Sequence, residues 1–465
     1  MKQNIVLLLF LLGCCTKKET PLPDLVISNA HVVDVINGNL IRNQDVTLDD
    51  DYIQSIKPHA ASSRAKVMVD GTDLFLIPGL WDMHVHIHGH SQTFLPLFMA
   101  FGVTGIRDLH NMEITDFNAW KKSVGQMSFA PRLGPVAGKT IDSYDGWAKP
   151  LVVTTEKEAR EAVRKNKEMG SDFIKIYDNV LPELIPAIID ECKKLGMPYA
   201  GHYLWGMDLR DQADLGFRSI EHLDISLSYA KNSEELLGRY RQYVVNGHGN
   251  DHNMDFFKDI IQAHQNRDPQ KMGEVFRKLK ATNTWQCTAV LAYVWNDALD
   301  YTNLTENDLG LQYYPDSLAK KYLAQGQNKT PETIEFGELS LKVYMDIVNE
   351  LYLHKVPLLA GGHPTPMAAL PPGITLHREL LLMQQAGIPS SEVLKTTTIN
   401  AAKFMNKQEE LGSVSVGKLA DLVLLRANPL EDIKNINTVQ GVFREGLYFD
   451  RDYIDSVLNQ LSMDN

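Results

Sequence analysis

Short apolar segments alternate with helical segments along most of this chain, and that alternation restricts the fold more than any other feature. From residue 77 onward, eight segments have the length and apolar character of buried strands. They are residues 77–86, 102–109, 132–137, 173–177, 198–202, 219–222, 284–288 and 357–361. Helical segments lie between most of them, which is typical of parallel strands joined by crossover helices. The sequence therefore predicts an α/β fold, a (β/α)8 TIM barrel over residues 77–405, with functional groups at the carboxyl ends of its strands.

One of the connecting helices has clear end signals. Thr155 and Glu158 have the spacing of a capping box, and Gly170 follows the last turn. We expect a helix over about residues 156–169.

Two connections are longer than neighbouring strands require. Residues 224–281 and 289–335 follow the sixth and seventh predicted strands, and both are helical in pattern and rich in Tyr, Trp and Asn. Insertions at that end of a barrel usually border the substrate site, which is what we expect here. The alternative is that they pack only on the outer helices.

Residues 24–76 have a different character, that of short strands and tight turns. Asn37-Gly38 is a strong hairpin signal within this region. Strand-like segments return after residue 406, among them 411–414. We predict a small β-sandwich domain built from both chain ends, residues 24–76 and 406–450, followed by a helix over 451–465. A single helix over about 391–405 is expected to end the barrel.

The N-terminus has the features of a targeting segment. Lys2 precedes an apolar run over residues 5–12 that is too short to span a bilayer, and Cys14 follows. This arrangement resembles a bacterial lipoprotein signal peptide. Residues 1–14 are then the signal with Cys14 as the lipidated residue, and 15–23 form a tether that anchors the protein to a membrane of the cell envelope. The alternative is a buried N-terminal strand.

Charge and cysteine content narrow the classes of partner. The 465-residue chain has a net charge of −12, whereas a nucleic-acid partner requires a basic face. The four cysteines are too few for a disulfide framework, and we expect Cys192 and Cys287 to be buried free thiols.

Histidines and one lysine occupy the predicted strand ends. His84 and His86 are two residues apart on the first strand and therefore share a face, as zinc ligands do. His202 and His222 end the fifth and sixth strands. The alternative is that these are ordinary core or surface histidines.

Lys175 lies among large apolar residues on the fourth predicted strand. Burial lowers the pKa of an amine, and a neutral amine reacts with CO₂ to give a carbamate that can bridge two cations. The alternative is an inward-pointing lysine paired with a carboxylate.

This combination resembles the amidohydrolase superfamily, in particular its imidazolonepropionase-like and prolidase-like branch. Further matching stretches are 102–108, 173–177, 220–222, 376–380 and 411–423. The resemblance implies a centre of two divalent metal ions per chain, with zinc expected. His84 and His86 would bind one ion, His202 and His222 the other, and carboxylated Lys175 would bridge them, with a metal-bridging hydroxide as the nucleophile.

The eighth predicted strand departs from the family pattern. The family has an aspartate there that binds metal and carries a proton to the leaving amine, whereas this chain has His363. An imidazole can ligate a metal or transfer protons near neutral pH, but a ligating nitrogen cannot carry a proton. Two hypotheses follow. One is a hydrolase of a small peptide, amide or cyclic amide in which His363 is catalytic. The other is a catalytically impaired binding or scaffold protein of the same fold.

Other polar residues near the predicted strand ends have weaker signals. We expect Asp82 to orient a ligand imidazole, Tyr177 to hydrogen-bond a substrate carbonyl or to pack, and Arg107 to pair with Asp108. His377 reads as structural. We expect His88 and His90 at the mouth of the site, and His248, His252 and His264 exposed to solvent. The sequence leaves the substrate and the oligomeric state open.

Overall fold

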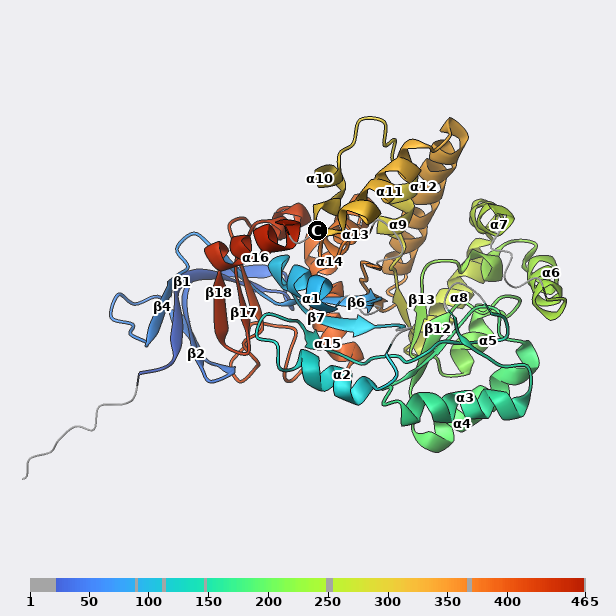
Figure 1. Cartoon of the computed structure of the whole chain (residues 1–465), viewed down its shortest axis with the longest axis horizontal. Helices are drawn as coiled ribbons and strands as arrows, with labels where there is room; N and C mark the ends of the chain where they lie inside the picture. Colours follow the sequence, from blue (N-terminus) through green and yellow to red (C-terminus); the bar gives the residue numbers. More distant parts are fainter. Residues whose placement is uncertain are drawn as a thin grey trace, which may run out of the picture.

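Strands from the two ends of the chain lie side by side (Figure 1). The structure, a computed structural model, describes residues 22–87, 91–110, 114–145, 149–247, 254–365 and 370–463. One eight-stranded sheet has the order β18-β17-β16-β5-β1-β2-β3, with β4 paired to β1. Its strands are β1 (Leu25–Asp34), β2 (Asn39–Asp49), β3 (Tyr52–Pro58), β4 (Val67–Asp70), β5 (Phe75–Pro78), β16 (Leu422–Leu425), β17 (Val439–Arg444) and β18 (Leu447–Asp450). The sandwich itself stays a prediction.

Two contacts explain how this sheet is ordered. The hairpin predicted at Asn37-Gly38 joins β1 to β2, and Gly38 has a φ of 70°, which glycine adopts at little cost. Ile77 of β5 pairs with Val423 of β16 in antiparallel register, so the last part of the chain is bonded to the first.

All eight predicted segments of the α/β region contain a strand. β6 (Leu80–Val85), β7 (Val103–Asp108) and β8 (Arg132–Leu133) form one parallel sheet. The other parallel sheet contains β11 (Ile174–Ile176), β12 (Tyr199–His202), β13 (Ser219–Glu221), β14 (Trp285–Cys287) and β15 (Leu358–Leu359). Two short strands that the sequence did not predict, β9 (Ile141–Asp142) and β10 (Leu151–Val152), extend it beyond β11. The strand pairing thus leaves two parallel sheets, and closure into one barrel stays a prediction.

Helices connect and cover these strands. The predicted capping box is confirmed in α3 (Glu156–Glu168), where Thr155 accepts from the Glu158 amide and Gly170 has a φ of 87°. The other helices near the strands are α1 (Ser91–Ala100), α2 (Phe117–Val124), α4 (Ile185–Leu195), α5 (Leu209–Asp214) and α13 (Ile374–Gln385). Among the residues that the structure describes, no helix is both long enough and apolar enough to cross a membrane.

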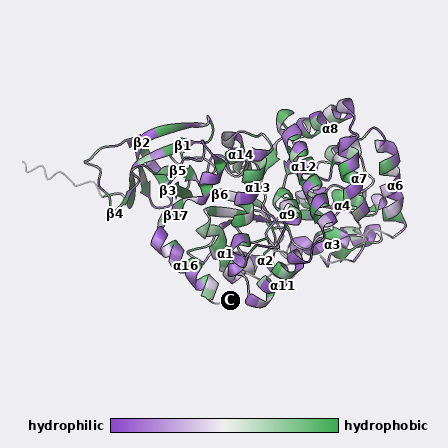
Figure 2. Cartoon of the chain, turned by 90° about the horizontal axis from the view of Figure 1, so that it is seen from above, coloured by the Kyte–Doolittle hydropathy of each residue, from purple (hydrophilic) through white to green (hydrophobic). Residues whose placement is uncertain are grey.

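The two insertions are helical, as expected. The first contains α6 (Ser233–Val245), α7 (Met254–Gln265) and α8 (Pro269–Ala281). The second contains α9 (Leu291–Ala298), α10 (Glu306–Leu309) and α11 (Asp316–Gln327), and leads into the long α12 (Pro331–Leu353). Both α8 and the C-terminal α16 (Arg451–Met463) carry hydrophilic and hydrophobic residues, as expected of helices with one face on the core (Figure 2).

Two local predictions were wrong. The helix expected over 391–405 is divided into α14 (Ser390–Thr396) and α15 (Ile399–Phe404). The division arises because Thr397 is bonded to β6: its carbonyl accepts from the Trp81 amide at 2.7 Å, and its hydroxyl donates to the Trp81 carbonyl at 2.7 Å. Residues 411–414, expected as a strand, have no strand pairing, and Leu411 packs instead in the cluster that contains Trp81.

Candidate metal centre

Five histidines converge from four separate strands. β6 presents His84, with His86 just beyond its end, and β12 ends at His202. His222 follows β13, and His363 follows β15 after a short loop. Because parallel strands have their carboxyl ends at one edge, residues far apart in the chain meet there.

The imidazole rings are close enough to share ligands. Ring centroids are 5.1 Å apart for His84 and His86, 4.8 Å for His202 and His222, and 4.7 Å for His84 and His363. The His222 ring links these pairs, because its centroid is 4.9 Å from that of His84 and 5.1 Å from that of His363. All the predicted histidine ligands and His363 therefore belong to one cluster.

Two members of the cluster have an uncommon backbone conformation. His222 has a φ of 67° and His363 a φ of 54°, both in the left-handed region that non-glycine residues seldom adopt. Such residues persist only where the surroundings hold them, and they are concentrated at functional sites. Both residues with this conformation carry rings of the cluster.

The Nδ1 atom of each predicted ligand faces an oxygen. The partners are Glu221 Oε2 for His84 (2.9 Å), the His110 carbonyl for His86 (3.4 Å), Asp178 Oδ2 for His202 (3.5 Å) and the Ala289 carbonyl for His222 (3.3 Å). A proton on Nδ1 that is donated to oxygen leaves the Nε2 lone pair for a metal, the usual arrangement of ligating histidines.

Glu221 is a functional residue that the sequence reasoning missed. It is buried, and besides His84 it accepts hydrogen bonds from Arg107 Nη2 at 2.8 Å and Ser219 Oγ at 2.5 Å. Burial alone would raise the pKa of Glu221, but Arg107 and Lys175 outweigh it, so the pKa is below its ordinary value and the group is ionised. An acidic residue inside an apolar strand was the available signal, since a buried carboxylate requires a partner.

The predicted Arg107–Asp108 ion pair is wrong. Arg107 is paired with Glu221 of a different strand, and its other donors reach the Met83 carbonyl at 2.7 Å and Ser219 Oγ at 3.0 Å. Consecutive strand residues point to opposite faces, which separates the side chains of Arg107 and Asp108.

Lys175 is buried beside the histidines and acts electrostatically on His84 and His222. Burial lowers its pKa to about 8, against the pull of Glu221. Within the part of the chain that the structure describes, Nζ has no hydrogen-bond partner and no carboxylate within ion-pair distance. The lysine–carboxylate pair considered as an alternative is therefore not seen there, and carboxylation of the amine stays a prediction.

Asp82 contacts backbone amides in this structure, and its predicted role toward a ligand imidazole stays a prediction. Its Oδ1 accepts from the backbone amides of Gly362 at 2.9 Å and His84 at 3.2 Å, rather than from an imidazole. Burial raises the pKa of Asp82 to about 8. This carboxyl holds together β6 and the loop that carries His363.

Tyr177 lies against His202, with ring centroids 4.2 Å apart. Burial raises the pKa of Tyr177 well above its ordinary value, so the hydroxyl remains a donor. Packing and substrate binding both remain compatible with this position.

The donor set fits a divalent metal. Ligand atoms of His84, His86 and His363 all lie within 4.8 Å of one another. His84 Nε2 is buried and, among the described residues, has no hydrogen-bond partner. Imidazole nitrogens suit zinc and its neighbours in the first transition series.

The remaining predicted histidines divide into three groups. His377 is structural, as predicted: it is buried, 2.8 Å from the Phe101 carbonyl, and also hydrogen-bonds Asn437. His264 is buried, so its predicted exposure was wrong. His88, His90, His248 and His252 lie outside the described residues, as does Cys14.

Cys192 and Cys287 are buried free thiols, as predicted.

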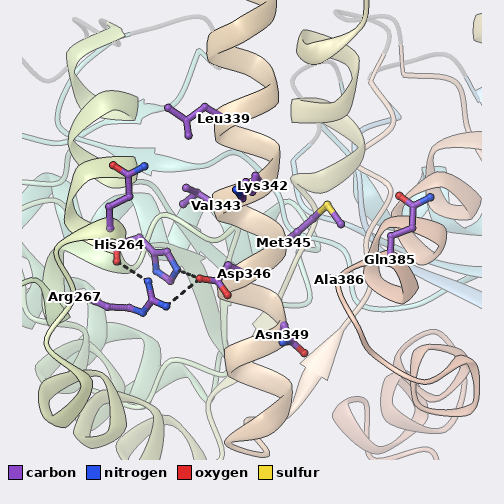
Figure 3. A pocket seen from close by; sticks show the side chains of 11 residues that line it. His264, Arg267, Leu339, Lys342, Val343, Met345, Asp346, Asn349, Gln385 and Ala386 are labelled. Atoms are coloured by element: carbon purple, nitrogen blue, oxygen red, sulfur yellow. Dashed lines mark hydrogen bonds and ion pairs between the residues drawn. The ribbon is translucent and has the colours of Figure 1, made fainter.

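The surroundings of His264 explain its burial (Figure 3). Nδ1 faces the Tyr229 hydroxyl at 3.0 Å, and Nε2 is 2.8 Å from Asp346 Oδ2, which also pairs with Arg267 at 3.2 Å. His264, Arg267 and Asp346 border a cleft of about 530 Å³ between α7, α12 and α13. None of the five clustered histidines lines it, so His264 ties helices together away from the candidate metal centre.

Comparison with known sequences gives partial matches. Residues 338–447 match the model of the amidohydrolase family. Among curated proteins, an adenine deaminase of Listeria welshimeri is 27% identical over 235 residues, 47% of this chain and 37% of that protein. A dihydroorotase of Carboxydothermus hydrogenoformans is 36% identical over 114 residues, 21% of this chain and 25% of that protein. The chain thus spans at most 37% of the length of these relatives.

Comparison with solved structures covers nearly the whole chain. A Xaa-Pro dipeptidase with bound methionine has a TM-score of 0.63 and 20% identity, over 92% of this chain and 99% of the other. Bottromycin amidohydrolase has a TM-score of 0.69 and 19% identity, over 94% and 90%. At such identities the likeness concerns the fold. The family-model match over residues 338–447 agrees with this likeness in fold.

Proposed function

We propose that this chain is a metal-dependent hydrolase of the amidohydrolase superfamily that cleaves a carbon–nitrogen bond in a small peptide, an amide or a cyclic amide. The observation that carries the proposal is the convergence of five imidazoles, two of them under the electrostatic influence of buried Lys175, with Nδ1 of the four predicted ligands facing oxygen. The related proteins named above act on amide-type or amino-substituted substrates by name, which agrees with this class of reaction.

The proposal includes a closed (β/α)8 TIM barrel. Two hydrogen bonds of 3.0 Å, from Met83 N to the Ala360 carbonyl and from His363 N to the His84 carbonyl, join β6 to the segment of β15. On the other side, a bridge between Ala137 and Phe173 links the two parallel sheets. For the β-sandwich domain, a bridge between Tyr52 and Leu419 supports a sheet that curls onto itself.

In this proposal His84 and His86 would hold one divalent cation and His202 and His222 a second, with carboxylated Lys175 as a shared ligand, and His363 is the catalytic imidazole beside them. Zinc is the expected ion. Bound cations would supply a Lewis acid for the scissile carbonyl and a more acidic water. Glu221 fixes the orientation of His84, and the Tyr177 hydroxyl is a donor placed beside His202 for a substrate carbonyl.

A second function is favoured by one observation. The His363 ring lies in the ligand group of His84 and His86. A nitrogen that ligates metal does not transfer a proton to the leaving amine, so a metal-binding protein of the same fold without turnover is the alternative.

Metal analysis combined with a substrate screen separates the two functions. Purified wild type, His363→Asp and, as a distant control, His59→Ala would be measured for metal content and for hydrolysis of dipeptides and cyclic amides. About two metals per chain with turnover in wild type supports the hydrolase. Metal without turnover in wild type, together with activity gained in His363→Asp, supports the alternative. Absence of bound metal from all three proteins would refute both the hydrolase and the metal-binding alternative.

The N-terminal segment is proposed as a lipid anchor, with Cys14 as its attachment site. The support is the sequence pattern alone: Lys2, the apolar run over 5–12 and the cysteine that follows it. The protein would then work at the cell envelope on small substrates.

A further inference from the structure

A second cleft lies at the opposite end of the strands from the histidines. It has a volume of about 200 Å³ and is lined at the amino ends of β11, β12 and β13, where Phe173, Tyr199 and Arg218 lie. Phe404, at the end of α15, closes one side, and Arg107 reaches it from β7. The proposed hydrolase function does not use this cleft.

Two guanidinium groups line the cleft, and within the described part of the chain only one of them is paired with a carboxylate. Both lie over the ring of Phe404, with Cζ at 4.8 Å for Arg107 and 5.0 Å for Arg218. Arg107 is neutralised by Glu221, and all its nitrogens donate to protein acceptors. Arg218 is half-buried and donates to the Phe404 carbonyl. Across the described residues, no carboxylate lies within ion-pair distance of it.

The carboxylate at the edge of the cleft, Asp172, already has two partners. Asp172 Oδ1 pairs with Lys121 at 2.8 Å, and Oδ2 accepts from the Val136 amide at 2.9 Å. Burial, and then repulsion from Arg107, lower the pKa of Arg218 below its ordinary value. The cleft is therefore a partly desolvated cationic site that lacks a counter-ion from the described chain.

We infer that this cleft binds a small organic carboxylate, with its anionic group on Arg218 and its apolar body against Phe173, Tyr199 and Phe404. A planar guanidinium matches a carboxylate through two parallel hydrogen bonds. The aromatic walls suit a ring or short hydrocarbon, and the volume is below that of pockets for drug-sized ligands. A phosphate dianion fits less well, because Arg218 is the one guanidinium here with unused donors.

Calorimetric titration with benzoate tests this site on the full-length, metal-loaded protein. Benzamide serves as the neutral ligand of the same shape. Wild type would be compared with Arg218→Gln and with Arg277→Gln, an exposed arginine on α8 as the matched control. We expect saturable benzoate binding in wild type and in Arg277→Gln, at least about tenfold weaker binding in Arg218→Gln, and little binding of benzamide.

Three results would overturn the inference. Equal benzoate affinity in Arg218→Gln would place the carboxylate elsewhere, for instance on the metal centre. Equal affinity for benzamide would remove the role of charge, and tighter binding of inorganic phosphate than of benzoate would replace the ligand class. If circular dichroism shows that Arg218→Gln does not fold, Arg218→Lys takes its place in the titration. A crystal of the wild type soaked in benzoate provides a second test. Benzoate density away from Arg218 would refute the site.

Discussion

At the scale of single residues, the candidate site depends on how buried charges are compensated. Glu221 carries one negative charge that is shared between Arg107 and the Nδ1 atom of His84. Lys175 has no such partner among the residues described, and burial lowers its pKa to about 8. The two buried groups therefore differ, because Glu221 stays ionised and orients His84, whereas Lys175 loses its proton more easily than an exposed lysine, as the proposed carboxylation requires.

Lys175→Met should change the pH dependence of stability in the metal-free protein. The pKa of Lys175 is lowered on folding, so the unfolded chain binds more protons between about pH 8 and 10.5, and wild-type stability should rise with pH across that window. The shift corresponds to about 3 kcal/mol, which Lys175→Met should lack. Denaturant unfolding at pH 7 and pH 10 measures the difference between the two proteins. Parallel curves would contradict the lowered pKa, and loss of a ¹³C-carbamate signal in the variant tests the carboxylation separately.

Glu221→Gln should weaken metal binding without removing any ligand. Loss of the carboxylate partner makes the His84 ring a poorer and less ordered ligand, which typically costs 10–100-fold in metal affinity. Competition with a chromophoric chelator gives the affinity, and Glu409→Gln, an exposed carboxylate, is the control. An unchanged affinity in Glu221→Gln would show that the His84–Glu221 contact does not support the site.

At the scale of elements, the loop after β15 decides where His363 lies. This loop is bonded to β6 through Asp82, which accepts from Gly362 N, and through the 3.0 Å hydrogen bond from His363 N to the His84 carbonyl. It also fits closely, since a Cβ on Gly362 would lie 2.6 Å from Leu376 N and 2.8 Å from Asp82 Oδ2. The ring therefore reaches the cluster because backbone contacts fix the loop, including a left-handed conformation at His363.

Gly362→Ala should lower both stability and metal content. The added methyl group meets backbone and a buried carboxyl, and such crowding commonly costs 1–3 kcal/mol. Gly238→Ala in α6 is the matched control, because its Cβ meets nothing within 4 Å, and it should stabilise the helix by about 0.5–1 kcal/mol. Chemical unfolding and elemental analysis of both variants provide the measurement. A Gly362→Ala protein as stable as wild type would mean that the loop shifts freely.

At the scale of the whole molecule, the two chain ends meet in one sheet. The antiparallel pairing of β5 with β16 places the start of the α/β region directly after the β-domain. Gly79 makes the transition, where a Cβ would lie 1.8 Å from Thr104 Oγ1. The strand that carries His84 therefore begins directly after a strand of the β-domain sheet, which ties the start of the candidate metal centre to that sheet.

Cys14→Ser should release the protein from the membrane fraction, because the proposed lipid would lose its attachment atom. Cys15→Ser is the matched control, since it changes the adjacent cysteine and should leave the protein in that fraction. Fractionation of cells followed by immunoblotting measures the distribution. Retention of the Cys14→Ser protein at the wild-type level would refute the anchor.

Much of this architecture follows from the chain itself. Apolar segments of strand length identify eight strands, because burial requires such residues and side chains alternate along a strand. The capping box of α3 and the hairpin before Gly38 are equally local. The histidine positions at strand ends were visible for the same reason, since parallel strands share one functional edge.

The sequence by itself determined which residues form strands and which side chains collect at their carboxyl ends. Tertiary structure alone decided the partners: that Arg107 meets Glu221 rather than Asp108, that His264 is buried, and that Asp82 binds backbone amides. The physical reason is that hydrophobic and capping signals depend on near neighbours in the chain. Compensation of buried charge depends on distances between strands and helices, which no local pattern records.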